Sequence, residues 1–137
     1  PVYPWFLINE MEVPLIKKAR EVNDGMVNYY YKKIEGIIGK KKNAKIGIIG
    51  LSYREGVKEK AYSRSFAMIK LIKSKGHDVY GLDPLYSKEE IESSFKVKLL
   101  DDFRKMDAII LMNKEVKYKD KLIEIKDMVV DVKRVLG

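Results

Sequence analysis

Apolar residues in the first third of the chain recur with the period of an α-helix. Between positions 14 and 38 they stand three or four residues apart and form one stripe: Leu15, Ala19, Val22, Met26, Tyr30, Ile34 and Ile37. Pro14 suits the first turn of this helix, and Gly39 suits a carboxyl-terminal cap. At 1.5 Å per residue the helix would be roughly 36 Å long, which exceeds the diameter of a small domain. Part of the stripe must therefore face another surface, most simply a second copy of the chain.

After a basic linker at 40–44, the pattern changes to short apolar strands that alternate with amphipathic helices. Strands are predicted at 45–51, 78–82, 107–112 and 128–132, with a weaker one at 97–100. Helices are predicted at 65–75, 88–93, 102–105 and about 118–125. Gly76 would close the first of these, and Ser87 with Glu90 forms a capping box. This alternation predicts an α/β fold: a Rossmann-like, doubly wound, mostly parallel sheet preceded by the long helix.

The predicted topology places a ligand site at the carboxyl ends of the strands. The first strand should be central, and it runs into the loop at 52–56; the third long strand ends at Asn113. Gly47, Gly50 and Gly56 lack the G-x-G-x-x-G spacing of dinucleotide-binding loops, so they are weak evidence for a phosphate. These two loops should nevertheless flank the crevice.

Two side chains of the first loop are candidate ligand-binding residues. Arg54 could hold a phosphate with its fork of donors, and Tyr53 could stack on a base. Alternatively, Arg54 is a solvated loop residue and Tyr53 covers the edge of the sheet. Their position alone does not decide between these interpretations.

Other polar residues have ordinary structural explanations. Asp83, followed by Pro84, could bind a ribose at the end of the second strand or simply begin a loop. We interpret His77 as a solvated turn residue and the aspartates at 101–102 as a helix cap. No second histidine and no clustered carboxylates accompany them, so we expect no metal site.

Composition narrows the class of protein. Hydrophobic residues make up 46% of the chain, which predicts a folded core. No apolar run approaches the ~18 residues of a membrane span, and the start of the chain does not resemble a signal peptide. Cysteine is absent, which excludes disulfides and thiolate metal sites within this chain. We expect a cytoplasmic protein with no membrane partner.

The chain is basic, with 28 Lys and Arg residues against 20 acidic residues. Such a charge attracts phosphates, but it is also typical of a lysine-rich solvated surface. The lysines are scattered apart from those at 40–42, and aromatic residues do not interleave with them. Because no nucleic-acid-binding motif is present, we expect no nucleic-acid partner.

Several stretches, in order along the chain, are similar to one family. Residues 1–7 (PVYPWFL) resemble its P-V-D-P-[YF]-[FY]-L, and 20–24 (REVND) its R-x-[VI]-N-[DE]. Residues 50–54 (GLSYR) resemble G-L-[AS]-[YF]-[KR], 59–63 (EKAYS) occupy the place of D-x-R-x-S, and 83–84 match its D-P. The chain thus resembles the carboxyl-terminal part of UDP-sugar 6-dehydrogenases, the UDP-glucose and UDP-N-acetyl-D-mannosamine dehydrogenase family.

The resemblance implies two domains: residues 1–40 end a central helical dimerisation domain, and 44–137 form a UDP-binding, Rossmann-like domain. The family oxidises the sugar C6 alcohol to a carboxylate with two NAD, through a thiohemiacetal on a cysteine. The resemblance places that cysteine before Pro1 and the NAD fingerprint in an amino-terminal domain. A chain that begins at Pro1 without methionine is expected to be a fragment of a longer protein. It should bind UDP-sugar, form a homodimer through the helix around 14–38, and be inactive alone.

Carried over residue by residue, Tyr53 and Arg54 match the pair that contacts the nucleotide sugar, and Lys133 or Arg134 match a basic residue used on the UDP-sugar. Two positions depart from the family. Tyr3 stands where an aspartate helps to activate water, and Ala61 stands where an arginine contacts NAD, with Lys60 beside it.

These departures leave a second hypothesis open, a degenerate, non-catalytic paralogue that serves as a nucleotide-binding module or scaffold. Between substrates, the first seven residues favour the N-acetyl-D-mannosamine type.

Overall fold

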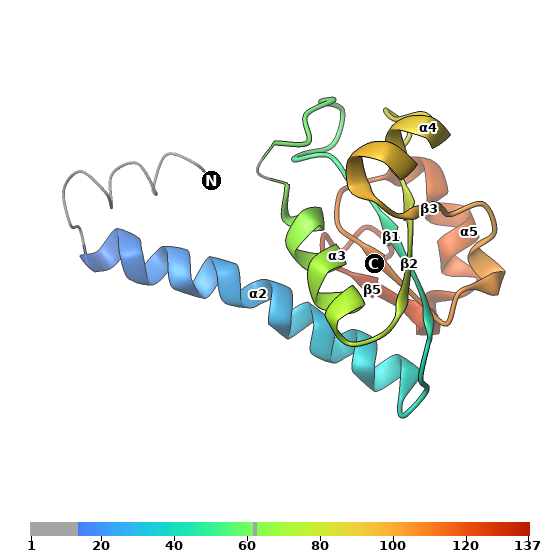
Figure 1. Ribbon diagram of the computed structural model, residues 1–137, viewed down its shortest axis with the longest axis horizontal. Helices are drawn as coiled ribbons and strands as arrows, with labels where there is room; N and C mark the ends of the chain where they lie inside the picture. Colours follow the sequence, from blue (N-terminus) through green and yellow to red (C-terminus); the bar gives the residue numbers. More distant parts are fainter. Residues whose placement is uncertain (1–13, 62) are drawn as a thin grey trace.

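The computed structural model describes residues 14–61 and 63–137 (Figure 1). Its strands form a single sheet in the order β3-β2-β1-β4-β5, and every pairing is parallel. The strands are β1 (Lys45–Ile49), β2 (Asp78–Leu82), β3 (Lys98–Leu99), β4 (Ala108–Leu111) and β5 (Val129–Asp131). The predicted α/β, Rossmann-like, doubly wound sheet is confirmed, with the first strand at its centre.

The central strands are covered on both faces. Every residue of β4 and every residue of β1 after Lys45 is buried, as expected for parallel strands that are apolar throughout. Alternate residues point to opposite sides, so Ile46 and Ile48 join one hydrophobic cluster while Ile49 joins the other. The domain therefore has two cores, one on each face of the sheet.

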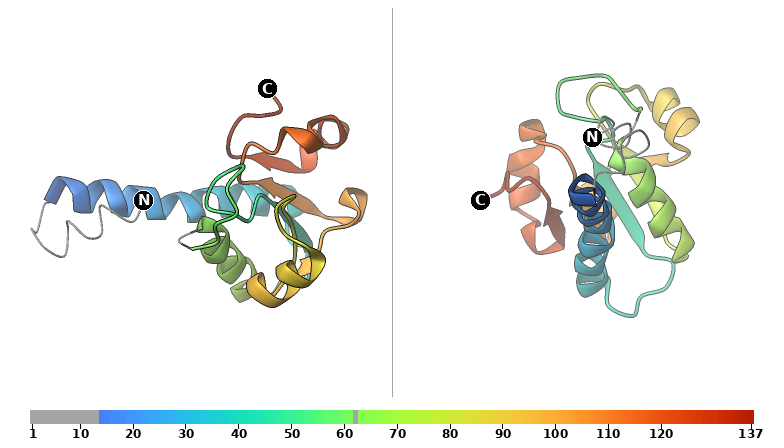
Figure 2. Two further views of the ribbon diagram at one scale, coloured as in Figure 1. Left: turned by 90° about the horizontal axis from the view of Figure 1, so that it is seen from above. Right: turned by 90° about the vertical axis from the view of Figure 1, so that its left-hand side faces the viewer.

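Helices cover these two faces unequally (Figure 2). On one face lie α2 (Pro14–Ile38), α3 (Arg64–Ser74), and α4 (Lys88–Glu90), which continues as the π-helix η1 (Ile91–Phe95). The other face has only short elements: η2 (Phe103–Lys105), η3 (Val116–Tyr118), α5 (Lys119–Ile123) and η4 (Lys126–Met128).

The long helix α2 contacts the domain over its second half only. Tyr31 and Ile34 are buried, and this part of α2 contacts α3, β4 and β5. The first half projects away from the sheet (Figure 1). There Leu15 is 79% exposed and Val22 is 59% exposed. The predicted apolar stripe is thus divided into a part within the core and a part without a partner among the described residues.

Several predicted boundaries need correction. The helix predicted at 88–93 begins at the expected capping box, but it becomes a π-helix at Ile91 and continues to Phe95. The helix predicted at 118–125 is divided between η3 and α5, and the one at 102–105 is a single 3₁₀ turn. The spacing of apolar residues predicts which side chains face the sheet. It does not distinguish 3₁₀-, α- and π-helices, whose backbone hydrogen bonds join residues three, four and five apart.

His77 also needs correction. Gly39 and Gly76 close α2 and α3 with φ values of +60° and +82°, as predicted. His77, next to Gly76, is not a solvated turn residue, because its Nδ1 accepts a hydrogen bond from the Ala44 amide at 3.1 Å. It therefore ties the turn before β2 to the linker before β1.

Candidate functional site

A pocket of ≈ 360 Å³ opens at the carboxyl edge of the sheet. It lies where strand order reverses between β1 and β4, the usual ligand site of such sheets. The predicted loops after β1 and β4 both contribute, together with the start of α3 and the end of β5. The lining residues are Gly50, Ser52, Tyr53, Arg54, Ser63, Arg64, Ser65, Met112, Asn113, Val132 and Lys133.

The edge of this pocket is organised by a buried aspartate. Asp83 is only 1% exposed, and its Oδ2 accepts hydrogen bonds from the amides of Leu51 and Ser52, each at 2.9 Å. The Ser52 hydroxyl donates a third bond to Oδ2 at 2.8 Å, and the Leu85 amide donates one to Oδ1 at 2.9 Å. Because its carboxylate is engaged by these donors, the structure favours the loop-entry interpretation of Asp83 over ribose binding.

The loops after β1 and β4 fit closely against each other. Gly50 has φ +88°, and a Cβ added there would lie 2.8 Å from the Asn113 amide nitrogen. The Asn113 Nδ2 also donates a hydrogen bond to the Ser52 carbonyl at 3.0 Å. Glycine is therefore required at position 50 by both backbone conformation and close approach, rather than by a phosphate.

The amino end of α3 forms another side of the pocket. Ser63 is its N-cap, and the hydroxyls of Ser63 and Ser65 donate to the Leu51 carbonyl at 2.7 and 2.8 Å. A helix amino end carries a partial positive charge and attracts anions. The sequence analysis included Ser63 as the last residue of the stretch at 59–63 but assigned neither serine to the site; the S-x-S spacing before an amphipathic helix was the signal that could have identified them.

The described residues that line the pocket carry charge of one sign. Arg54, Arg64 and Lys133 are basic, and none of the other described lining residues is acidic. Tyr53 also lines the pocket and is 40% exposed, so it does not pack under its loop. Basic groups, a helix amino end and an accessible aromatic ring provide donors for phosphates and a surface on which a base can stack.

The remaining predicted site residues lie elsewhere. Arg134 is exposed and outside the lining, although it follows Lys133 directly. Lys60 donates a hydrogen bond to the Ser94 hydroxyl at 3.1 Å, and Ala61 is exposed; neither lines the pocket. Tyr3 lies outside the described residues. Asp102 is a helix cap, as predicted, because its carboxylate accepts from the Arg104 amide at 3.0 Å.

A second buried carboxyl group lies beyond the end of β4. Glu115 is 7% exposed, and its Oε1 has no hydrogen-bond partner among the described residues. Burial raises the pKa of Glu115, and the negative charges of Asp83 and Glu55 raise that pKa further. No pattern in the sequence predicts a role for this residue, since it stands among lysines in a loop.

Two further observations concern the whole described part of the chain. Residues 14–61 and 63–137 contain no group of three or more histidine, cysteine, aspartate or glutamate side chains that could hold a metal ion. None of the helices in these ranges has both the length and the apolar character needed to cross a bilayer.

Comparison with known sequences gives a family match and several relatives. Residues 47–137 match the UDP binding domain of the UDP-glucose/GDP-mannose dehydrogenase family. The UDP-N-acetyl-D-mannosamine dehydrogenase of Methanocaldococcus jannaschii is 30% identical over 133 residues, covering 88% of this chain and 31% of that protein. The protein of the same name from Methanococcus aeolicus is 30% identical over 129 residues, covering 85% of this chain and 27% of that protein.

Solved structures share the fold. A UDP-glucose dehydrogenase from Pyrobaculum islandicum superposes with a TM-score of 0.73 at 21% identity, over 95% of this chain and 33% of that one. A UDP-D-ManNAc dehydrogenase from Pyrococcus horikoshii gives a TM-score of 0.71 at 20% identity, over 98% and 34%. The chain therefore spans about a third or less of the length of these similar proteins.

The environment of Glu115 predicts a pH-dependent stability. Its raised pKa means that the folded state favours the protonated form of Glu115. The protonated form therefore contributes fully to the stability of the fold below pH ~4.5, and this contribution is lost as pH rises through the pKa of the folded state. Glu115→Gln should therefore stabilise the fold at neutral pH by about 1 kcal/mol, and by less under acidic conditions. Urea unfolding at pH 5 and pH 8 measures this difference.

The exposed Glu92→Gln serves as the control and should change stability little at either pH. A Glu115→Gln variant that is less stable than the wild type at pH 8 would contradict the assignment of an unfavourable buried charge.

Proposed function

The chain belongs to the UDP-glucose/GDP-mannose dehydrogenase family, and we propose that it is the UDP-sugar-binding, dimerising carboxyl-terminal part of a UDP-sugar 6-dehydrogenase. The observation that carries this proposal is the pocket at the strand-order reversal. It combines Arg54, Arg64 and Lys133 with the amino end of α3 and an accessible Tyr53. A diphosphate would lie among the cations and a base against the ring.

Among UDP-sugars, we propose UDP-N-acetyl-D-mannosamine as the substrate of the parent protein. The names of the relatives from Methanocaldococcus jannaschii and Methanococcus aeolicus support this choice over UDP-glucose. The first seven residues support it as well, although they lie outside the described ranges. The reaction would oxidise the sugar C6 alcohol to a carboxylate with two NAD.

The described residues do not fit a nicotinamide dinucleotide. The loop after β1 lacks the G-x-G-x-x-G spacing. The acid at the end of β2, which binds ribose in nicotinamide enzymes, is engaged here by backbone amides and the Ser52 hydroxyl. We therefore assign NAD binding and hydride transfer to a part of the parent outside this chain, and the chain alone should form no NADH.

The projecting half of α2 supports a homodimer. Leu15 and Val22 lie on this half, and Tyr29 follows just beyond it; the three stand seven residues apart and all are exposed. Two such stripes packed together would cover apolar surface that the described chain leaves in water. Residues 1–40 would then end the dimerisation domain, and 44–137 would form the UDP-binding domain.

A degenerate scaffold is the second candidate, because Tyr3 and Ala61 replace the aspartate and arginine of the family pattern. It shares the nucleotide pocket with the first candidate and differs from it in catalysis.

Removing a pocket cation should weaken nucleotide binding. Arg54→Ala and Lys133→Ala should each reduce the affinity for UDP about tenfold, since hydrogen bonds between charged groups contribute about 1.5–3 kcal/mol. Isothermal titration calorimetry measures the change. Arg134→Ala is the matched control, being adjacent but outside the lining, and should bind like the wild type. Equal losses in Lys133→Ala and Arg134→Ala would contradict the pocket assignment.

The proposed dimer can be tested on α2. The wild-type chain should sediment as a dimer, and Val22→Asp should sediment as a monomer, because a charge would be buried in the seam. Lys17→Asp introduces the same side chain at an exposed position off the stripe and should leave the dimer intact. A monomeric wild-type chain would remove α2 from the dimer interface.

The parent protein should be catalytic. With NAD and UDP-N-acetyl-D-mannosamine it should form two NADH per sugar, and with UDP-glucose it should react more slowly; NADH absorbance follows both reactions. A parent that binds UDP but oxidises neither sugar would favour the degenerate scaffold. Faster oxidation of UDP-glucose would contradict the substrate assignment alone.

A further inference from the structure

The loop that carries Tyr53 and Arg54 is folded back on itself. The Tyr53 amide donates to the Glu59 carbonyl at 2.6 Å, and Arg54 forms an antiparallel bridge with Val57. We refer to residues 53–60 as the flap. No residue of the flap belongs to either hydrophobic cluster, so apolar packing does not fix its position.

Two lysines connect the flap to α4 and η1. Lys58 Nζ lies 2.6 Å from Glu90 Oε1, and it also lies 5.3 Å from the centroid of the Tyr86 ring. Lys60 Nζ donates to the Ser94 hydroxyl at 3.1 Å. The flap and α4 lie at the same end of the domain (Figure 1). The partners of both lysines are more than 30 residues away in sequence.

The receiving side of these contacts is well anchored. Glu90 uses its Oε2 to accept from the Ser87 amide at 2.8 Å, completing the capping box of α4. The Tyr86 ring packs edge-on against Phe95, whose ring stacks on Phe66 of α3. The hydrogen bond from Lys58 lowers the pKa of Glu90, and so does the bond from the Ser87 backbone. Glu90 therefore presents a charged, oriented oxygen to the flap.

We propose that Lys58 and Glu90 form an ion-pair latch that positions the flap, and with it Tyr53 and Arg54, at the nucleotide pocket. This inference rests on the proposed function, since it assigns Lys58 and Glu90 as positioning residues for UDP. An exposed ion pair contributes little to global stability. It is enough, however, to shift the population of a short segment between docked and released positions.

An alternative is that the pair only stabilises the fold at the surface. The latch differs from it in a measurable way: loss of the pair should loosen residues 53–60 and leave the rest of the domain unchanged. Two substitutions remove the pair with little other damage. Glu90→Gln keeps the capping box, because glutamine also serves at that position. Lys58→Met keeps an unbranched stem beside Tyr86.

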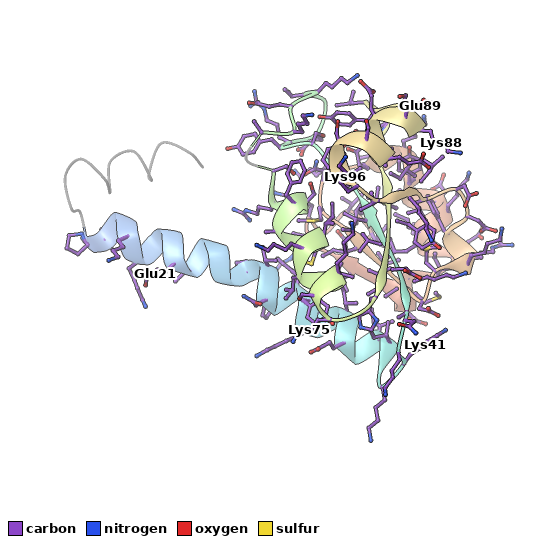
Figure 3. The ribbon with its side chains drawn as sticks, in the orientation of Figure 1. Glu21, Lys41, Lys75, Lys88, Glu89 and Lys96 are labelled. Atoms are coloured by element: carbon purple, nitrogen blue, oxygen red, sulfur yellow. The ribbon has the colours of Figure 1, made fainter. Side chains whose placement is uncertain are left out.

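Hydrogen exchange tests the latch without any nucleotide. In Glu90→Gln and Lys58→Met the amides of Tyr53 and Val57 should exchange severalfold faster, while amides of β1 and β4 keep their wild-type rates. Glu89→Gln is the matched control, because Glu89 is exposed on α4 (Figure 3) and directly precedes Glu90 in the sequence. Unchanged exchange at Tyr53 and Val57 in both variants would overturn the latch.

UDP titration then tests the positioning role. Glu90→Gln and Lys58→Met should each weaken UDP binding about two- to fivefold, and the double variant should lose no more than either single one. At 1 M salt, where the Debye length is about 3 Å, the difference from the wild type should disappear. Faster flap exchange with unchanged UDP affinity would overturn the positioning role. A wild-type chain that binds no UDP would instead contradict the proposed function, and the exchange result would still decide whether the latch holds the flap.

Discussion

The buried carboxylate of Asp83 is the constraint on which the carboxyl edge of the sheet depends. A charged group removed from water needs hydrogen bonds in place of hydration. Asp83 obtains them from backbone amides at both strand ends and from the Ser52 hydroxyl. Among residues 14–61 and 63–137 no cation is paired with Asp83. Its burial therefore depends on the backbone at the ends of β1 and β2 keeping one geometry. The backbone conformation at the start of the flap is therefore fixed in the absence of a ligand.

The same constraint separates charges at this edge. Negative groups lie beneath the strand ends. Burial raises the pKa of Tyr118 there, and the charges of Glu115 and Asp83 raise that pKa further. Positive groups, Arg54, Arg64 and Lys133, line the pocket instead. An incoming diphosphate would meet these cations and the amino end of α3. The buried acids contribute by shaping the backbone rather than by touching the ligand.

Much of this arrangement could be predicted from the sequence, because the strands are short apolar runs whose order follows from right-handed crossovers. The position of Tyr53 and Arg54 after the central strand predicted that their loop flanks the crevice, but it did not decide between ligand binding and a structural role. Local patterns could not choose between Lys133 and Arg134, because the choice depends on the backbone after β5, where Arg134 has a φ of +54°. Local patterns also could not predict the contacts of Lys58 and Lys60, because their partners lie in a different crossover connection of the sheet.

We propose that the crevice beside the buried Asp83 binds a uridine diphosphate group. Amide chemical-shift mapping of the wild-type chain during a UDP titration is the sharpest test of this binding. The largest shifts should fall on Gly50, Ser52, Tyr53, Arg54, Asn113 and Lys133, with small changes at the opposite edge of the sheet. A spectrum that stays unchanged at millimolar UDP, or shifts clustered around the linker and the end of α2, would contradict it.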